Sequence, residues 1–161
     1  MGCGIFICAL LALSGCNTFS SKSNASKVTQ FEQDTTVGTE DVSIAAVGLV
    51  GVPYVYGGNT PKGGFDCSGL IVYVYNKAAG IRLPRTILLM SARGRSIENQ
   101  PPAPGDLLFF NTTGEKYSHA GIYVGQGRFV HAPSAGGTVR LEQIENPYWA
   151  ARFTEARRFT P

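Results

Sequence analysis

One cysteine and two histidines in this 161-residue chain have the types and spacing that nucleophilic catalysis requires. Cys67 follows Asp66, a favourable helix N-cap, so its sulfur is expected where unpaired backbone N–H groups and the helix dipole favour a thiolate. His119 and His131 are the only two histidines, and the Gly125-Gln-Gly127 turn between them predicts a hairpin that makes them cross-strand neighbours. In that arrangement Cys67 is the nucleophile, His119 its general base, and His131 the residue that fixes the tautomer of His119.

Two other interpretations of these three residues stay open from the sequence. A free Cys is commonly a small buried core residue, and either histidine taken singly is more often structural. One Cys and two His also suffice for a three-ligand zinc site, but no Cys-x-x-Cys or His-Glu-x-x-His motif and no acidic cluster supports one. We therefore expect neither a metal nor another cofactor.

The elements that precede residue 107 are expected to be helices. A short apolar helix is predicted at residues 42–50, with folded structure starting near Glu40. A second is predicted at 67–79, with Asp66 as N-cap and Gly80 as the stop. A third short helix is predicted from Thr86 to about Ala92.

From residue 107 the apolar period changes to two, which indicates strands. The expected strands are 107–110, 120–124, 128–131, 138–142 and 150–158. Helices followed by an antiparallel sheet of about five strands make an α+β fold. In the strand after His119, the alternation places His119, Gly121 and Tyr123 on one face, with room for a substrate over Gly121.

The N-terminal segment has the composition of a leader. Residues 1–16 read MGCGIFICALLALSGC, with no charged side chain and an apolar stretch too short to span a membrane. Its end resembles the lipobox of bacterial lipoproteins, which predicts a signal peptide at 1–15 and lipidation of Cys16. The n-region lacks the Lys or Arg that such signals normally carry. Residues 16–39 then read as a polar tether, and 40–161 as one domain.

Composition excludes two classes of protein. The net charge is +3, and Lys and Arg are scattered along the chain, so a nucleic-acid partner is not expected. Seven Tyr, nine Phe and many β-branched residues supply enough apolar surface for a folded core, which argues against disorder over most of the chain.

Six motifs occur in the order and spacing of one known family. They are Pro53-Tyr-x-Tyr-Gly-Gly58, Asp66-Cys-Ser-Gly69, Leu83-Pro-Arg-Thr86, Pro104-Gly-Asp-Leu-Leu-Phe-Phe110, Ser118-His-Ala-Gly-Ile-Tyr-Val-Gly125 and Phe129-Val-His-Ala132. In these motifs the chain from about residue 40 onward resembles the NlpC-type cell-wall cysteine peptidases. The ending, residues 146–158, is similar to the lipoprotein members in particular.

This resemblance implies a papain-like α+β fold and a peptidoglycan hydrolase. The implied activity is a cysteine endopeptidase that cuts stem peptides between D-γ-glutamyl and the diamino acid, although some relatives cut the cross-link between stems. The family's nucleophile falls on Cys67, its general base on His119 and its orienting residue on His131. Its substrate-side tyrosine falls on Tyr54, whose hydroxyl would help to hold the oxyanion beside the backbone N–H of Cys67.

Ser68 and Arg85 fall in motifs that line the family's cleft. Arg85 is expected either to bind a stem-peptide carboxylate through both arms of its fork or to be a surface charge beside a helix. Two departures from the family pattern bear on specificity: the loop at residues 59–66 is one residue longer than in many relatives, and Met90 replaces a frequent Gln.

Two alternative functions and a cellular location are also expected from the sequence. One rival is a catalytically silent lipoprotein that binds peptidoglycan, and the other is an amidase or acyltransferase on a related scaffold. Permuted relatives place the His before the Cys, whereas here Cys67 comes first. Asn17, rather than Asp, follows Cys16, which favours the outer membrane, facing the periplasm. The expected partners are stem peptides and a membrane, the latter through the lipid anchor, and the protein is expected to be a monomer.

Overall fold

The computed structural model describes residues 1–2, 37–134 and 136–160. The predicted signal peptide, the lipidated Cys16 and the tether up to residue 36 lie outside these residues. Helix α1, Val37–Val47, begins five residues before the predicted helix at 42–50. It also begins three residues before Glu40, where folded structure is expected to start, so residues 37–39 belong to the folded domain. Within the described ranges, no helix has both the length and the apolar composition to cross a membrane.

Within the described residues, three helices precede the main sheet. Helix α2, Cys67–Ala79, has the predicted bounds, with Asp66 as N-cap and Gly80 in the left-handed conformation at its end. Helix α3, Ile87–Ser91, is capped by Thr86 as expected. Helix α1 ends at Val47 instead of residue 50, because the chain then tightens into a turn that runs to Gly51 at a φ of 94°.

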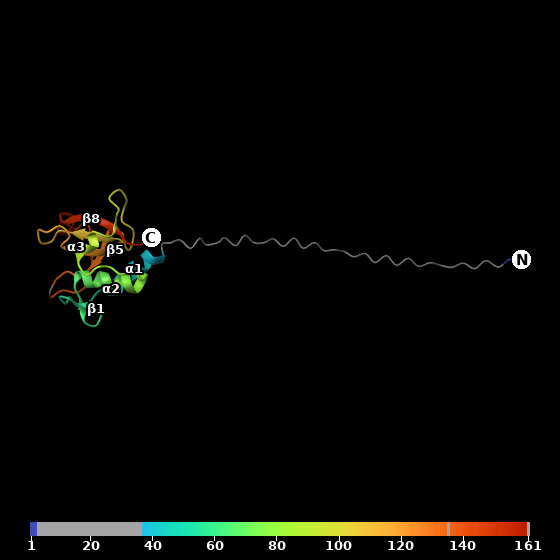
Figure 1. The fold of residues 1–161 in the computed structure, drawn as a ribbon, viewed down its shortest axis with the longest axis horizontal. Helices are drawn as coiled ribbons and strands as arrows, with labels where there is room; N and C mark the ends of the chain where they lie inside the picture. The colour runs from blue at the N-terminus through green and yellow to red at the C-terminus, as the bar shows by residue number, and fades with distance from the viewer. Residues whose placement is uncertain (3–36, 135, 161) are drawn as a thin grey trace. The chain divides into compact units, whose positions relative to one another are not determined.

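A six-stranded antiparallel sheet follows, in the order β3-β8-β4-β5-β6-β7. Its strands are β3 Arg95–Ser96, β4 Leu107–Phe110, β5 His119–Gly125, β6 Arg128–His131, β7 Arg140–Gln143 and β8 Phe153–Arg158. A separate hairpin joins β1 Asn59–Thr60 to β2 Gly64–Phe65. Helices α1 and α2 pack against each other and against β5, side by side in Figure 1. The α+β prediction is confirmed.

The sheet is covered on both faces. In β4, Leu107 and Phe109 join the core beneath the helices, whereas Leu108 and Phe110 join a smaller cluster that contains Trp149. This alternation is the period of two that predicted the strand. Trp149 belongs to α4, Pro147–Ala150, a short helix that the sequence analysis did not predict.

Three local expectations were wrong. Residues 138–139 do not start β7, because Thr138 bridges Pro53 and the N–H of Val139 donates to Val52. Strand β8 starts at Phe153 instead of residue 150, because Asn146 and Pro147 begin α4 in that stretch. The space over Gly121 is not open to a substrate: a Cβ built there would lie 2.5 Å from the Phe129 ring.

Candidate active site

Cys67 occupies the first position of α2, and a glycine-rich loop lies directly against that end of the helix. A Cβ on Gly69 would lie 2.0 Å from the carbonyl oxygen of Gly58, so only glycine allows this approach. A Cβ on Gly58 would likewise collide with Gly64, at 2.4 Å. The glycines of two of the sequence motifs therefore serve to bring the loop against the residue that carries the thiol.

Asp66 holds this arrangement together with both carboxylate oxygens. Oδ1 accepts from the N–H of Gly69 at 2.7 Å, and Oδ2 from the N–H of Gly57 at 2.9 Å. The two terminal nitrogens of Arg85 donate to the same carboxylate, one to each oxygen at 2.8 Å. Asp66 is therefore both the cap of the helix and the centre of a polar network.

Both terminal nitrogens of the Arg85 guanidinium therefore already donate to Asp66. The sequence left two roles open for Arg85, a bidentate contact to a substrate carboxylate or a surface charge beside a helix. In the structure Asp66 accepts a bidentate contact from Arg85, which also donates to the hydroxyl of Ser68. Burial alone would raise the pKa of Asp66, but the hydrogen bonds from Arg85 and Gly69 and the charge of Arg85 lower it overall. The carboxylate therefore stays ionised.

A cavity of about 610 Å³ gives access to Cys67. Tyr54, Ser68 and Arg85 line it together with the thiol, so three of the residues assigned by resemblance meet there. Tyr117 lines it too, with a φ of 65° that is uncommon for a non-glycine residue. Its ring packs edge-on against Phe109, at 5.8 Å between centroids, which helps to hold the strained residue just before β5.

The thiol does not have the resting ionisation that its helix position suggested. Burial raises the pKa of Cys67, and the negative charge of Asp66 raises it further. Backbone N–H groups at the start of α2 and the charge of Arg85 oppose this shift without reversing it. The expectation of a favoured thiolate was therefore wrong, because burial outweighs the helix terminus, and the thiol needs a base.

The two histidines lie in contact on neighbouring strands, as the hairpin predicted. Nε2 of His119 is 2.9 Å from Nδ1 of His131, and the rings meet edge to face. Both side chains are buried, His119 with 5% exposed and His131 with none. Nδ1 of His119 has no partner in the described part of the chain and is not enclosed, so it is open to a reactant.

Trp149 forms the packed wall of this pair. Its ring stacks on His119 at 5.6 Å and meets His131 edge-on at 4.7 Å. Burial lowers the pKa of His119 to about 4, with a smaller effect from the charge of Arg140. Burial, followed by the charges of His119 and Arg140, also lowers the pKa of His131. Both imidazoles are therefore neutral at pH 7, as a general base must be.

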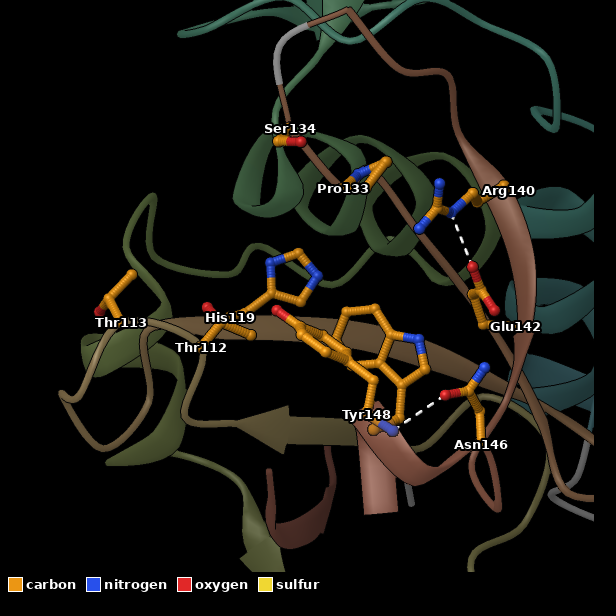
Figure 2. A pocket seen from close by; sticks show the side chains of 10 residues that line it. Thr112, Thr113, His119, Pro133, Ser134, Arg140, Glu142, Asn146 and Tyr148 are labelled. Atoms are coloured by element: carbon orange, nitrogen blue, oxygen red, sulfur yellow. Dashed lines mark hydrogen bonds and ion pairs between the residues drawn. The ribbon is translucent and has the colours of Figure 1, made fainter. Parts of the chain in front are cut away.

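The cysteine and histidine parts of the site adjoin each other. Tyr117 and Ser118, the two residues before His119, line the cavity that holds Cys67. Among the described residues, no hydrogen bond joins the thiol to His119. A second cavity opens at His119 itself, where Figure 2 shows its ring beside Tyr148 and across from Arg140 and Glu142.

Comparison with known proteins agrees with this geometry. The profile of the NlpC/P60 family matches residues 51–158, which is most of the described domain and more than half of the chain. The chain belongs to the NlpC/P60 family. The matched span contains the thiol, both histidines, the Asp66 network and Trp149.

Curated and solved relatives support the same conclusion. The chain is 45% identical to a gamma-DL-glutamyl hydrolase of Bacillus subtilis over 124 residues, 75% of this chain and 30% of the relative. It is 39% identical to the murein DD-endopeptidase MepH of Escherichia coli over 112 residues, 68% of this chain and 41% of the relative. The chain therefore spans less than half the length of these two relatives. The crystal structure of the NlpC/P60 domain of the peptidoglycan hydrolase SagA superposes with a TM-score of 0.63 at 31% identity, covering 74% of this chain and 97% of that domain.

Sequence reasoning missed three residues of this NlpC/P60 site. The sequence analysis includes Trp149 only in the ending that resembles the lipoprotein members. The signals that could have identified it are that it is the single Trp of the sequence and that it follows Asn146-Pro147, a favourable helix start. Nothing in the sequence indicated the positive φ of Tyr117. Arg140 reaches the histidines because it pairs with His131 across β6 and β7, a register that the sequence did not fix.

A three-ligand zinc site requires three side chains that converge on one point. Over the described ranges, no three His, Cys, Asp or Glu side chains converge as metal ligands. Nδ1 of His131 already faces Nε2 of His119, and the other ring nitrogen of His131, Nε2, is fully buried.

Proposed function

We propose that this domain is a cysteine endopeptidase that hydrolyses peptidoglycan stem peptides, with Cys67 as nucleophile, His119 as general base and His131 as its orienting residue. The observation that carries the proposal is the buried histidine pair, which uses Nε2 of His119 and leaves its Nδ1 without a partner among the described residues, while the two residues before His119 line the cavity of Cys67. Family membership and the names of the curated relatives support the same chemistry.

The acylation step begins from a neutral thiol and a neutral imidazole. Nδ1 of His119 takes the thiol proton as Sγ of Cys67 attacks the scissile carbonyl carbon. The charged imidazole then donates its Nε2–H to Nδ1 of His131, 2.9 Å away, which stabilises the cation and fixes its orientation. The C–N bond breaks when His119 returns the proton to the leaving amine, and a thioester remains.

Water completes the reaction. His119 removes a proton as water attacks the thioester, the C–S bond breaks, and the proton returns to Sγ. The products are a new carboxylic acid and the free amine formed in the first step. The backbone N–H of Cys67 and the hydroxyl of Tyr54 are proposed to hold the oxyanion, since Tyr54 lines the cavity of the thiol.

For the bond, we propose the D-γ-glutamyl–diamino acid linkage. The 45% identical relative is named for gamma-DL-glutamyl hydrolysis, and the 39% identical one for DD-endopeptidase activity. Cleavage of the cross-link is thus the second candidate. A catalytically silent binding protein is the third, but the chain keeps the Cys and both His residues.

Mass spectrometry of the products tests the proposal. The purified full chain is incubated with defined muropeptides, both monomeric and cross-linked, with Cys67→Ala as the matched control. Fragments that end in γ-D-glutamate, absent with Cys67→Ala, are the expected result. Cleavage at the cross-link alone would move the enzyme to the second specificity, and full activity of Cys67→Ala would overturn the mechanism.

The remaining expectations concern where the enzyme works. We propose that a lipid on Cys16 anchors it in the cell envelope, in the outer membrane on the periplasmic side, and that it acts as a monomer. The lipobox-like sequence before Cys16 and Asn17 after it support this. Fractionation of cells that carry the natural chain or Cys16→Ala, each followed by immunoblotting, tests the anchor: only the natural chain is expected in the membrane fraction.

A further inference from the structure

A second cavity, of about 470 Å³, lies on the histidine side of the site. Its lining includes two aromatic residues beside His119, Tyr148 and Trp149, and two charged residues, Arg140 and Glu142. Cys67 lines the other cavity and not this one. Of these five residues, the reaction proposed above uses only His119, so the cavity and its charged pair have no assigned role.

The proposed reaction decides which part of a substrate this cavity receives. The acyl carbon must reach Sγ of Cys67, and the leaving nitrogen must reach the imidazole that protonates it. The acyl residue therefore occupies the cavity of Cys67. The residue that contributes the leaving amine extends from His119 into the second cavity.

Two opposite charges face this second cavity from one strand. Arg140 and Glu142 are two residues apart on β7, so both project from the same face, as Figure 2 shows. Nε of Arg140 lies 2.8 Å from Oε1 of Glu142. The terminal nitrogens of Arg140 form no hydrogen bond with any described residue, and half of the side chain is exposed, so they remain available to a ligand carboxylate.

We propose that this cavity is the leaving-group subsite, and that Arg140 and Glu142 select a diamino acid whose side chain ends in both a carboxylate and an ammonium group. Diaminopimelate has such an end, whereas lysine ends in an ammonium group alone. The carboxylate would accept from Arg140 and the ammonium group would donate to Glu142, while the methylene chain lies along the aromatic wall. This proposal rests on the proposed function.

A lysine side chain in the same cavity can pair with Glu142 but not with Arg140. Its ammonium group can reach Glu142, but it brings a second positive charge beside Arg140 and offers that guanidinium no acceptor. A hydrogen bond to a charged group that one substrate makes and the other lacks corresponds to about tenfold discrimination. Diaminopimelate is therefore expected to be preferred through Arg140, and Glu142 to contribute to both substrates.

The test compares kcat/KM of the full chain for L-Ala-γ-D-Glu-diaminopimelate and L-Ala-γ-D-Glu-L-Lys. Each peptide is amidated at its C-terminal α-carboxyl, so that only the diaminopimelate side chain brings a carboxylate to the leaving residue. We expect a preference of about tenfold for the first peptide, falling to about one in Arg140→Gln, and a loss on both peptides in Glu142→Gln. The ratio of the two peptides cancels any change that Arg140→Gln causes at His119. Arg95→Gln, which removes an exposed charge from β3 at the other edge of the sheet, is the matched control and should keep the wild-type ratio.

Calorimetric binding of both peptides to Cys67→Ala separates this proposal from the function on which it rests. Equal cleavage and equal binding of the two peptides would overturn the subsite and leave the peptidase intact. If the wild type cleaves neither peptide but Cys67→Ala binds the diaminopimelate peptide through Arg140, the subsite holds and the peptidase proposal fails. An unchanged ratio in Arg140→Gln would also overturn the subsite.

Discussion

The cysteine side and the histidine side of this site are held together by different interactions. Around Cys67, Asp66 and Arg85 satisfy each other through paired hydrogen bonds that also reach the backbone. Around His119 and His131 the neighbours are aromatic rings, and Nε2 of His131 is buried without a partner among the described residues. One side is thus a polar network and the other a packed cluster.

This difference explains how the two sides treat charge. The polar network keeps the carboxylate of Asp66 ionised by lowering its pKa. The packed cluster lowers the pKa of His119 to about 4 and so keeps the imidazole neutral at pH 7. A base that is neutral at rest and has one fixed partner for its charged state suits a proton shuttle. The predictions below break one side at a time.

Removing the imidazoles breaks the packed side at its chemical centre. His119→Ala is expected to lower kcat/KM by at least about 10³-fold, because the thiol loses its base. His131→Ala should cost about 10- to 100-fold, because the base remains but loses its orientation, and His131→Gln should recover part of that loss. Progress curves on a stem peptide measure the rates, and thermal melts check the fold. Equal losses at the two positions would contradict the assigned roles.

Trp149→Ala breaks the packing instead of the chemistry. Trp149 has 5% of its surface exposed and contacts both imidazoles, so its removal leaves a cavity and should cost about 4 kcal/mol of unfolding free energy. Urea unfolding measures this value. Tyr148→Ala, at the adjacent position with 47% exposed, is the matched control and should cost less than about 1 kcal/mol. Similar losses in the two variants would show that the aromatic cluster is not what stabilises this side.

The parts of the molecule that the sequence predicted are those set by local signals. Asp66 and Gly80 mark the ends of α2 because of their own capping and backbone preferences. Strands β4 and β6 follow from the period of two in the apolar residues within each strand. The contact of His119 with His131 followed from a short hairpin turn. Each of these depends on neighbours in the chain.

The parts that were missed depend on distant segments. Residues 138–139 lie outside β7 because they pair with the segment near Pro53 instead. The position over Gly121 is filled by Phe129, which lies on the neighbouring strand β6. The pKa of Cys67 rises because the folded core buries the thiol, which a helix-start argument does not include. Trp149 contacts His119 and His131, which lie on strands distant from it in the sequence, so this packing could not be predicted from its neighbours in the chain.

Acid should weaken the packed side over a defined pH range. His119 titrates near pH 6.5 in an unfolded chain and near 4 in the folded one, so between these values the unfolded state binds more protons. The stabilisation from His119 is complete above about pH 6.5, and roughly 3 kcal/mol is lost as the pH falls to about 4. Melting temperatures between pH 7 and 4 test this. His119→Gln should show a shallower decline than the wild type, and parallel curves would contradict the burial argument.

Asp66→Asn breaks the polar side and should cost less stability than Trp149→Ala. The amide keeps one acceptor for the N–H of Gly69 but loses the charge that pairs with Arg85, for an expected cost of about 1 to 2 kcal/mol at pH 7. Because the folded-state pKa of Asp66 lies below 3.8, its charge-dependent stabilisation is present above that value and is lost as the pH falls through the folded pKa. Wild type and variant should therefore differ in urea unfolding at pH 7 and converge at lower pH.

Asp106→Asn provides the comparison that separates stability from activity. Asp106 is buried and accepts hydrogen bonds from Nε and one terminal nitrogen of Arg158, at 2.7 Å each, so it is held by a bidentate arginine as Asp66 is by Arg85. It lines neither of the two cavities of the site. Both variants should lose stability, but only Asp66→Asn should lower kcat/KM, because only Asp66 holds the loop and the helix end that present Cys67. Equal activity in the two variants would mean that the polar network supports the fold without positioning the nucleophile.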